Sequence, residues 1–427
     1  MNKIKTEVLS TGLFLIALLG LSFLSASIFK QQNQALAQQY IQTIKYRNLV
    51  IDLGNGVKTN AQLTYPAIGK GPFPGVLLVH AAGPADMNYT TGIHNKLFWQ
   101  IAQYLSERGF VVLRYDKRGI GANSTIINDN VWGNMTSNDL IQDAEKVVNV
   151  LAQQPEVDAK RISIIGHSEG GAIVTRVAID NPITKVKNIV LMAARIGTLH
   201  DVMYYIFVGL PLEYAKQVLD KNHSSSIPIE QAVKDPIYGR YIAFSLASYR
   251  IYSTNATTNS NTTNIGTLFN LLLPSEASSS SNTTNRQFAE TIPHTSAAGL
   301  INIDKQFKPS LERTFERAFK ASTTGEIHSN KCEMPMLCPL YFKSVFSLKP
   351  TLSIIGNVSS STGILILHGQ NDSSSPVQQA FLLQQRLTEL NHPEHTLITY
   401  PGLGHSFYLD SLVPSLITRP GPIEPYV

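Results

Sequence analysis

A glycine-rich turn at residues 166–170 carries the residues best suited to chemistry. It reads Gly-His-Ser-Glu-Gly, follows the apolar run at 162–165 and opens a stretch with helical character at 169–180. A sharp turn between a strand and a helix holds a serine hydroxyl clear of the backbone, and its glycines let the two elements approach closely. The N–H groups at the start of the helix can stabilise a developing oxyanion. The pattern predicts that Ser168 is a nucleophile; the alternative is an ordinary strand-to-helix turn.

A serine hydroxyl becomes nucleophilic when a base removes its proton and an acid orients that base. Asp372 comes directly after the apolar strand predicted at 363–369, and His405 lies in a glycine-rich segment beyond the strand predicted at 395–400. A carboxylate just beyond the carboxyl end of a strand lies on the ligand-binding edge of an open sheet. We therefore predict Asp372 as the acid, although it could instead cap the next helix, and His405 as the base.

An oxyanion hole needs two N–H donors aimed at the position where negative charge develops. The N–H of Ala81, in the loop after the strand predicted at 75–80, is the first candidate, and that of Glu169 is the second. Asp116 and Arg118, at the end of another predicted strand, are expected to lock loops together through a charge-assisted pair rather than to contact substrate.

The elements that must position these residues alternate between strands and helices. An antiparallel pair is expected at 48–53 and 59–65, with a turn at 54–56. Further strands are predicted at 75–80, 110–115, 161–166, 187–193, 363–369 and 395–400, and helices at 94–108, 137–154, 169–180 and 375–390. Such alternation predicts the α/β class, with a mostly parallel central sheet flanked by helices.

The alternation stops between residues 198 and 345. This region has helical patterns together with a Ser-, Thr- and Asn-rich stretch at 253–285. We predict a core made of 38–197 and 346–427 and a large, mainly helical cap insertion at 198–345, with a flexible polar loop at 253–285. The helical patterns lie at 201–221, 236–250 and 308–321. An apolar run at 267–273 interrupts the polar loop and could instead form a lid over the active site or touch a membrane.

The first 37 residues have the features of a targeting segment. Lys3 and Lys5 precede a largely apolar stretch at 8–29, and an Ala-x-Ala site ends at Ala37. This predicts either a signal peptide cleaved after Ala37 or, because the stretch is just long enough to span a bilayer, a retained membrane anchor. Either outcome makes the rest of the chain extracellular or anchored on the outer face of the membrane.

Composition limits the classes of function that remain. Of the 427 residues, 43% are hydrophobic, which is enough for a sizeable core, and the net charge of +5 is not gathered into a basic stripe. We therefore expect no nucleic-acid partner and no cofactor. In an exported chain the only two cysteines, Cys332 and Cys338, are predicted to form a disulfide, with two free thiols as the alternative. A zinc site at this pair would need two further ligands.

Three segments together resemble the α/β-hydrolase superfamily and, within it, esterases related to serine aminopeptidases and dienelactone hydrolases. They are His-Ala-Ala-Gly-Pro-Ala-Asp at 80–86, Arg-Tyr-Asp-Lys-Arg-Gly at 114–119 and Gly-His-Ser-Glu-Gly-Gly at 166–171. The resemblance covers about residues 48–197 and 360–408. It implies the α/β-hydrolase fold and a catalytic triad in the chain order serine, acid, histidine.

The residues favour a serine hydrolase that cleaves carboxylic esters through an acyl-enzyme intermediate. Its substrate would be a small ester or a short acyl or peptidyl compound. A small exported serine aminopeptidase is one alternative. A catalytically silent binding protein on the same fold is another, because fold alone does not decide function. The presence of Ser168, Asp372 and His405 in the expected order favours an enzyme.

Overall fold

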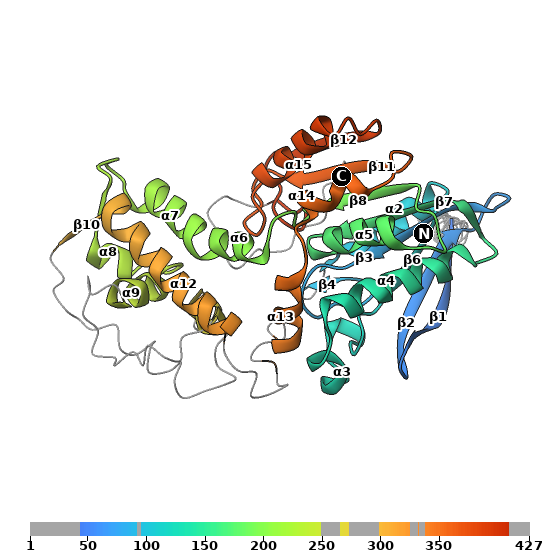
Figure 1. The fold of residues 1–427 in the computed structure, drawn as a ribbon, viewed down its shortest axis with the longest axis horizontal. Coiled ribbons are helices and arrows are strands. Elements are labelled where there is room, and N and C mark those ends of the chain that lie inside the picture. The colour runs from blue at the N-terminus through green and yellow to red at the C-terminus, as the bar shows by residue number, and fades with distance from the viewer. Residues whose placement is uncertain are drawn as a thin grey trace, which may run out of the picture.

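The chain forms a central sheet with helices on both sides and a second group of helices beside it (Figure 1). This arrangement is seen in a computed structural model. It describes residues 43–91, 95–248, 265–272, 299–324, 332 and 338–409. The predicted signal peptide or anchor at 1–37 lies outside the described residues, as does most of the predicted polar loop at 253–285. Within the described ranges, no helix has the length and apolar character that a membrane span requires.

Eight strands form the central sheet in the order β1-β2-β6-β3-β7-β8-β11-β12. They are β1 (Ile44–Gly54), β2 (Val57–Pro66), β3 (Phe73–Val79), β6 (Val111–Tyr115), β7 (Val157–His167), β8 (Asn188–Met192), β11 (Gly363–Gly369) and β12 (His395–Tyr400). Strand β2 is antiparallel to both of its neighbours, and all other neighbours are parallel. The mostly parallel sheet predicted from the alternating pattern is confirmed. A short second pair joins β4 (Thr90–Thr91) and β5 (Asn95–Lys96).

Both faces of the sheet bury apolar side chains, as the continuous apolar run of β3 requires. The helices of this part of the chain are α2 (Leu97–Glu107), α3 (Asp129–Gly133), α4 (Ser137–Ala152), α5 (Glu169–Asp180), α14 (Thr351–Ile354) and α15 (Gln378–Glu389). Leu77 and Val79 pack on one face with α4, α5 and α15, whereas Val76 and Leu78 pack on the other with α2. We call the sheet and these helices the sheet core.

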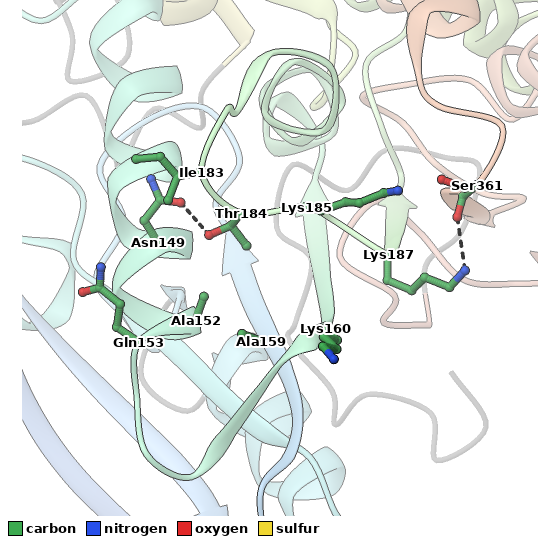
Figure 2. A pocket seen from close by; sticks show the side chains of 10 residues that line it. All are labelled: Asn149, Ala152, Gln153, Ala159, Lys160, Ile183, Thr184, Lys185, Lys187 and Ser361. Atoms are coloured by element: carbon green, nitrogen blue, oxygen red, sulfur yellow. Dashed lines mark hydrogen bonds between the residues drawn. The ribbon is translucent and has the colours of Figure 1, made fainter.

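The two ends of the parallel strands have different surroundings. A cavity of about 490 Å³ lies at the amino ends of β7 and β8 and beside the segment that leads into β11 (Figure 2). Its lining includes Lys160, Lys185 and Lys187, and Lys187 donates a hydrogen bond to the backbone oxygen of Ser361 at 3.2 Å. The residues predicted to do chemistry follow the carboxyl ends of β7, β11 and β12, so this cavity lies at the opposite edge of the sheet from them.

The region at 198–345, which we call the insertion, is mainly helical and has a hydrophobic core of its own. Its first helical stretch contains α6 (Leu199–Tyr204) and α7 (Leu210–Tyr214), each followed by a π-helical turn, at Tyr205–Gly209 and Ala215–Leu219. The further elements are β9 (Ser226–Pro228), α8 (Ile229–Val233), α9 (Gly239–Ser248), α10 (Ile265–Leu272), β10 (Leu300–Asn302), a π-helical turn at Ile303–Phe307, α12 (Lys308–Thr324) and α13 (Pro339–Ser347).

The described part of the apolar run at 267–273 packs inside the insertion. It forms most of α10, and its Leu268, Leu271 and Leu272 are buried in the core of the insertion. Helix α10 packs against α9 and α12. Burial against these helices accounts for its apolar character without a lid.

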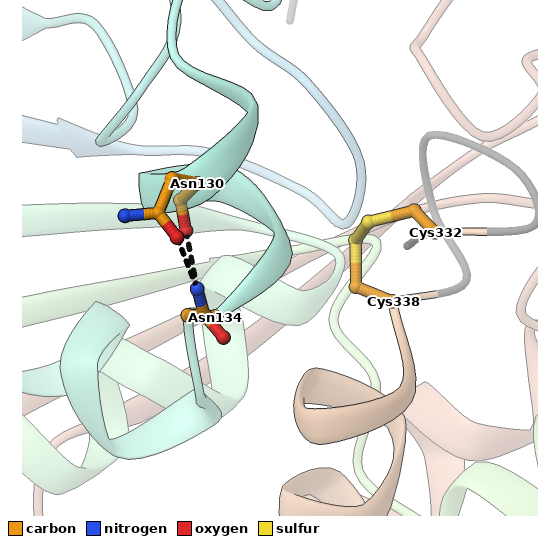
Figure 3. Close-up of a disulfide and its surroundings, with 4 residues drawn as sticks. All are labelled: Asn130, Asn134, Cys332 and Cys338. Atoms are coloured by element: carbon orange, nitrogen blue, oxygen red, sulfur yellow. Dashed lines mark hydrogen bonds between the residues drawn. A yellow bond between two sulfur atoms is a disulfide. The ribbon is translucent and has the colours of Figure 1, made fainter. Parts of the chain in front are cut away.

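Helix α13 joins the insertion to the sheet core. Its Tyr341 and Val345 pack in the hydrophobic core of the sheet, whereas Phe342 packs in that of the insertion. A disulfide connects Cys338, the residue that precedes the helix, to Cys332 (Figure 3). The start of α13 is therefore fixed covalently as well as by packing.

Candidate active site

Ser168 occupies a strained turn between β7 and α5. Its φ is 55° and its ψ is −114°, a combination that a non-glycine residue adopts only when its surroundings impose it. A Cβ on Gly166 would lie 2.3 Å from the backbone oxygen of Gly170, and a Cβ on Gly170 would lie 2.3 Å from that of Val79. No side chain fits at either distance. The strand-to-helix turn predicted from the glycine spacing is therefore present, and both glycines are needed to build it.

Asp372 and His405 are brought together from the ends of β11 and β12. The Nδ1 atom of His405 lies 2.9 and 3.0 Å from the two carboxylate oxygens of Asp372. The Asp372 carboxylate also accepts backbone N–H groups from Ser374 and Ser375, each at 2.8 Å. When Nδ1 of His405 donates to Asp372, its Nε2 is left unprotonated and can act as a base.

Asp372 is held in its charged form although only 1% of its surface is exposed. Burial acts to raise the pKa of Asp372, but the charge of His405 and hydrogen bonds from His368 and His405 outweigh burial and lower that pKa well below its ordinary value. His368 also contacts the backbone oxygen of Ser375 at 2.8 Å. A permanently charged carboxylate is what an imidazole needs for orientation and for stabilisation of its protonated state.

His167 connects the turn at Ser168 with the segment that carries His405. Its Nε2 lies 2.9 Å from the backbone oxygen of His405, and the centroids of the two rings are 4.9 Å apart. Ser168, Asp372 and His405 thus belong to one hydrogen-bonded cluster of segments. Among the described residues no hydrogen bond joins the Ser168 hydroxyl to the His405 ring, a contact that often tightens only when substrate binds.

The two N–H groups predicted for the oxyanion hole are both available. Glu169 is the first residue of α5, so its N–H has no partner within that helix. The N–H of Ala81 donates to no group in the described part of the chain. A Cβ on Gly170 would also lie 2.8 Å from the backbone oxygen of His80, which shows how closely the loop after β3 approaches the start of α5.

The predicted pair of Asp116 and Arg118 does not form. Arg118 instead contacts two carboxylates of α4, Asp143 at 2.6 Å and Asp139 at 3.1 Å. Asp116 accepts the backbone N–H of Met87 at 2.7 Å, and burial raises the pKa of Asp116 to about 6. The prediction was wrong because α4 offers the guanidinium two acceptors, which a pattern of adjacent residues cannot reveal.

The insertion reaches this site through two tyrosine hydroxyls that sequence reasoning did not identify. Tyr205, in the first π-helical turn, donates to the backbone oxygen of Asp372 at 3.4 Å. Tyr341 of α13 donates to the side chain of Glu169. Both contacts join segments far apart in the sequence, so no local pattern signals them.

Two parts of this chain match models of known protein families. Residues 91–295 match the serine aminopeptidase family S33, and residues 334–414 match the prolyl oligopeptidase family. The esterase EstD of Thermotoga maritima is 33% identical over 180 residues, which are 40% of this chain and 40% of the esterase. This chain therefore aligns with less than half of the length of that relative.

Solved structures with similar folds have low sequence identity. The proline iminopeptidase of Mycobacterium smegmatis is 12% identical with a TM-score of 0.44, over 84% of this chain and 92% of its own. The α/β hydrolase GrgF of Penicillium sp. sh18 is 16% identical with a TM-score of 0.43, over 84% of this chain and 91% of its own.

Proposed function

Because the chain belongs to the α/β-hydrolase superfamily, we propose that it is a serine hydrolase that cleaves small carboxylic esters. One observation carries the proposal. Two short contacts between His405 and the buried Asp372 occur at the same sheet edge as the strained turn of Ser168. This combination of groups supports nucleophilic catalysis.

The proposed reaction proceeds through an acyl-enzyme. Ser168 attacks the ester carbonyl carbon while His405 takes the hydroxyl proton, and Asp372 stabilises the resulting imidazolium. The N–H groups of Ala81 and Glu169 bind the oxyanion, each lowering the barrier by about 3 kcal/mol. His405 then gives its proton to the leaving alcohol. Water, deprotonated by His405, attacks the acyl group, and the acid departs as Ser168 recovers its proton.

An aminopeptidase is the second candidate, because the S33 family is named for that activity. An aminopeptidase must bind the ammonium group of its substrate, for which a carboxylate is the natural partner. Glu169, the residue after Ser168, carries a carboxylate next to the proposed nucleophile. That carboxylate already accepts the Tyr341 hydroxyl and forms an ion pair with Lys117. This engagement, together with the esterase relative, favours an ester substrate.

We also propose that the protein acts outside the cytoplasm. The proposal rests on the sequence of the first 37 residues. The disulfide between Cys332 and Cys338 supports it, since disulfides persist mainly in oxidising compartments. A reporter phosphatase that is active only outside the cytoplasm, fused after residue 45, should become active in producing cells. An inactive fusion that accumulates in the cytoplasm would contradict this proposal.

A substrate panel tests the proposed activity. Purified protein should hydrolyse p-nitrophenyl esters at least about 100-fold faster, in kcat/KM, than aminoacyl p-nitroanilides, a difference of about 2.7 kcal/mol in transition-state binding. Ser168→Ala should lose both activities. Preference for the anilides would establish the aminopeptidase. Absence of any turnover by folded protein would favour a binding protein on a hydrolase fold.

A further inference from the structure

A charged side chain is buried directly beside the nucleophile, and the reaction described above gives it no role. Glu169 follows Ser168 in the chain, and only 4% of its surface is exposed. One oxygen of its carboxylate accepts the hydroxyl of Tyr341, and the other lies 3.6 Å from the ammonium nitrogen of Lys117. Burying a carboxylate is costly unless it is paired and hydrogen-bonded, so the three residues depend on one another.

Lys117 connects this carboxylate to the loop that follows β3. Its ammonium group, 3% exposed, donates to the backbone oxygens of Ala81 at 2.5 Å and Gly83 at 3.1 Å. A lysine ammonium has three donors. Two of them hold the loop, and the same ammonium group forms an ion pair with the Glu169 carboxylate at 3.6 Å. Lys117 therefore joins the two segments whose N–H groups are the proposed oxyanion donors.

We propose that Lys117, Glu169 and Tyr341 are positioning residues that fix the spacing of the oxyanion hole and connect it to the insertion. The proposal rests on the proposed function. Lys117 holds the loop that carries the Ala81 N–H against the start of α5, which carries the Glu169 N–H. Tyr341 holds the Glu169 side chain from the other side. A shift of one donor by about 1 Å would lower the rate by roughly 100-fold.

The network also has an electrostatic role. A carboxylate beside the reacting carbonyl would by itself oppose the negative charge that develops on the carbonyl oxygen. The ammonium of Lys117 compensates for that charge, and the Tyr341 hydroxyl donates to it. Burial and the nearby Glu169 charge raise the pKa of Tyr341, so its hydroxyl stays protonated and remains a donor at neutral pH.

Helix α13 is well suited to hold Tyr341 in place. The Ser344 hydroxyl oxygen accepts the backbone N–H of Ser137 at 2.7 Å, which fixes the helix against the start of α4. The disulfide at Cys338 constrains the chain that enters the helix. The chain is therefore held on both sides of Tyr341, by the disulfide at Cys338 before it and by the Ser344 contact after it.

The first test replaces one hydroxyl group and uses a matched control. Tyr341→Phe removes the bond to Glu169, and Tyr241→Phe removes another buried tyrosine hydroxyl bond, made to the backbone oxygen of Phe207 within the insertion. We expect Tyr341→Phe to lower kcat for a p-nitrophenyl ester by roughly 10- to 100-fold with KM within about 2-fold. The control should keep the wild-type kcat at a similar thermal midpoint. Equal kcat values for the two variants would overturn the proposal.

The second test asks whether the residues act together. Glu169→Gln keeps a side chain that can accept the Tyr341 hydroxyl but removes the charge that attracts Lys117. It should lower kcat by roughly 10- to 100-fold, and adding Tyr341→Phe should lower it by less than about 3-fold more, since residues in one network are not additive. Independent, multiplicative losses would overturn the network.

The rate at which Ser168 reacts with a fluorophosphonate gives a second readout, and it should fall in parallel with kcat. Wild-type turnover tests the proposed function, whereas the ratio of variant to control tests the network, so the two failures are distinguishable. Wild-type protein that neither turns over esters nor reacts with the probe would overturn both.

Discussion

The sheet core and the insertion are organised by different rules. In the sheet core, parallel pairing places the carboxyl ends of β7, β11 and β12 at one edge, and the segments that follow them carry Ser168, Asp372 and His405. The insertion buries its own apolar side chains around α9, α10 and α12. Two tyrosine hydroxyls of the insertion reach the site: Tyr205 contacts the backbone oxygen of Asp372, and Tyr341 contacts the side chain of Glu169.

The difference indicates a division of labour. The groups proposed to react are held by the backbone of the sheet and by Gly166 and Gly170, where a Cβ would lie 2.3 Å from a backbone oxygen. The insertion adds hydroxyl groups that support these segments but do not react. Changes in the sheet core should therefore alter the chemical step, whereas changes in the insertion, apart from the Tyr341 hydroxyl that contacts Glu169, should mainly alter stability.

The largest expected effect is on the chemical step in the sheet core. Ser168→Ala should lower kcat by about 10⁴- to 10⁶-fold and Asp372→Asn by about 10⁴-fold, because each removes a member of the proposed triad. Steady-state ester hydrolysis measures both. Ser163→Ala is a matched control on β7, where the hydroxyl accepts a hydrogen bond from the Asn188 side chain, and it should keep nearly full activity. Full activity in Ser168→Ala would refute the assignment of the nucleophile.

The two hydrophobic cores can be compared by equivalent leucine truncations. Leu113 in the sheet core and Leu268 in the insertion are both 0% exposed. Each change to alanine should lower the free energy of unfolding by about 3 kcal/mol, through lost burial and a residual cavity. Urea unfolding measures this. At a temperature where both variants are folded, Leu268→Ala should keep kcat within about 3-fold. A loss below about 1 kcal/mol for Leu268→Ala would contradict the burial of α10.

Acid should destabilise the sheet core through two buried histidines. Burial lowers the pKa of both His80 and His167 to about 3, with further lowering by Lys117 at His80 and by the His405 charge at His167. Between about pH 6.5 and 3 these two histidines therefore bind more protons in the unfolded chain than in the folded chain, so their contribution to stability falls as pH drops. The slope should reach about 1.4 kcal/mol per pH unit for each histidine.

Unfolding measured in urea at pH 7.5, 6 and 5 tests this slope. His167→Gln should reduce it by up to half, whereas His223→Gln, at an exposed position of the insertion, should not change it. Identical slopes for wild type and His167→Gln would show that His167 does not contribute.

The smallest effect is expected at the junction of the two regions. Replacing Cys332 and Cys338 by serine opens a loop closed over a separation of 6 residues and should lower the free energy of unfolding by about 2 kcal/mol. Because α13 stays anchored by Val345 and Phe342, kcat should fall less than in Tyr341→Phe. A loss of kcat as large as that of Tyr341→Phe would show that the disulfide, rather than helix packing, holds the tyrosine in place.

The sheet core could be predicted from the sequence because its signals are local. Apolar runs bounded by glycines predicted its strands. The helix predicted at 169–180 coincides with α5 (Glu169–Asp180). Parallel pairing then brings the carboxyl ends of these strands to one edge, so the proximity of Asp372 and His405 followed from their positions after β11 and β12. Here local pattern and global fold agree.

The contacts between segments could not be predicted in the same way. The partners of Arg118 and Glu169 belong to elements distant in the sequence, and a charged residue gives no periodic signal of its partner. The apolar run of α10 was ambiguous for the same reason, because a buried helix and a lid have the same composition. Tertiary packing decides between them, and it acts only once the sheet and the helices are in place.

A covalent label tests the central claim most directly. Intact protein treated with a fluorophosphonate, digested and analysed by mass spectrometry should carry one adduct, on the peptide that contains Ser168. Heat-denatured protein should carry none, because the reaction needs His405 and the oxyanion donors in place. Stoichiometric labelling of Ser168 with parallel loss of ester hydrolysis is the predicted result. An unlabelled Ser168 in folded protein that still hydrolyses esters would contradict the account.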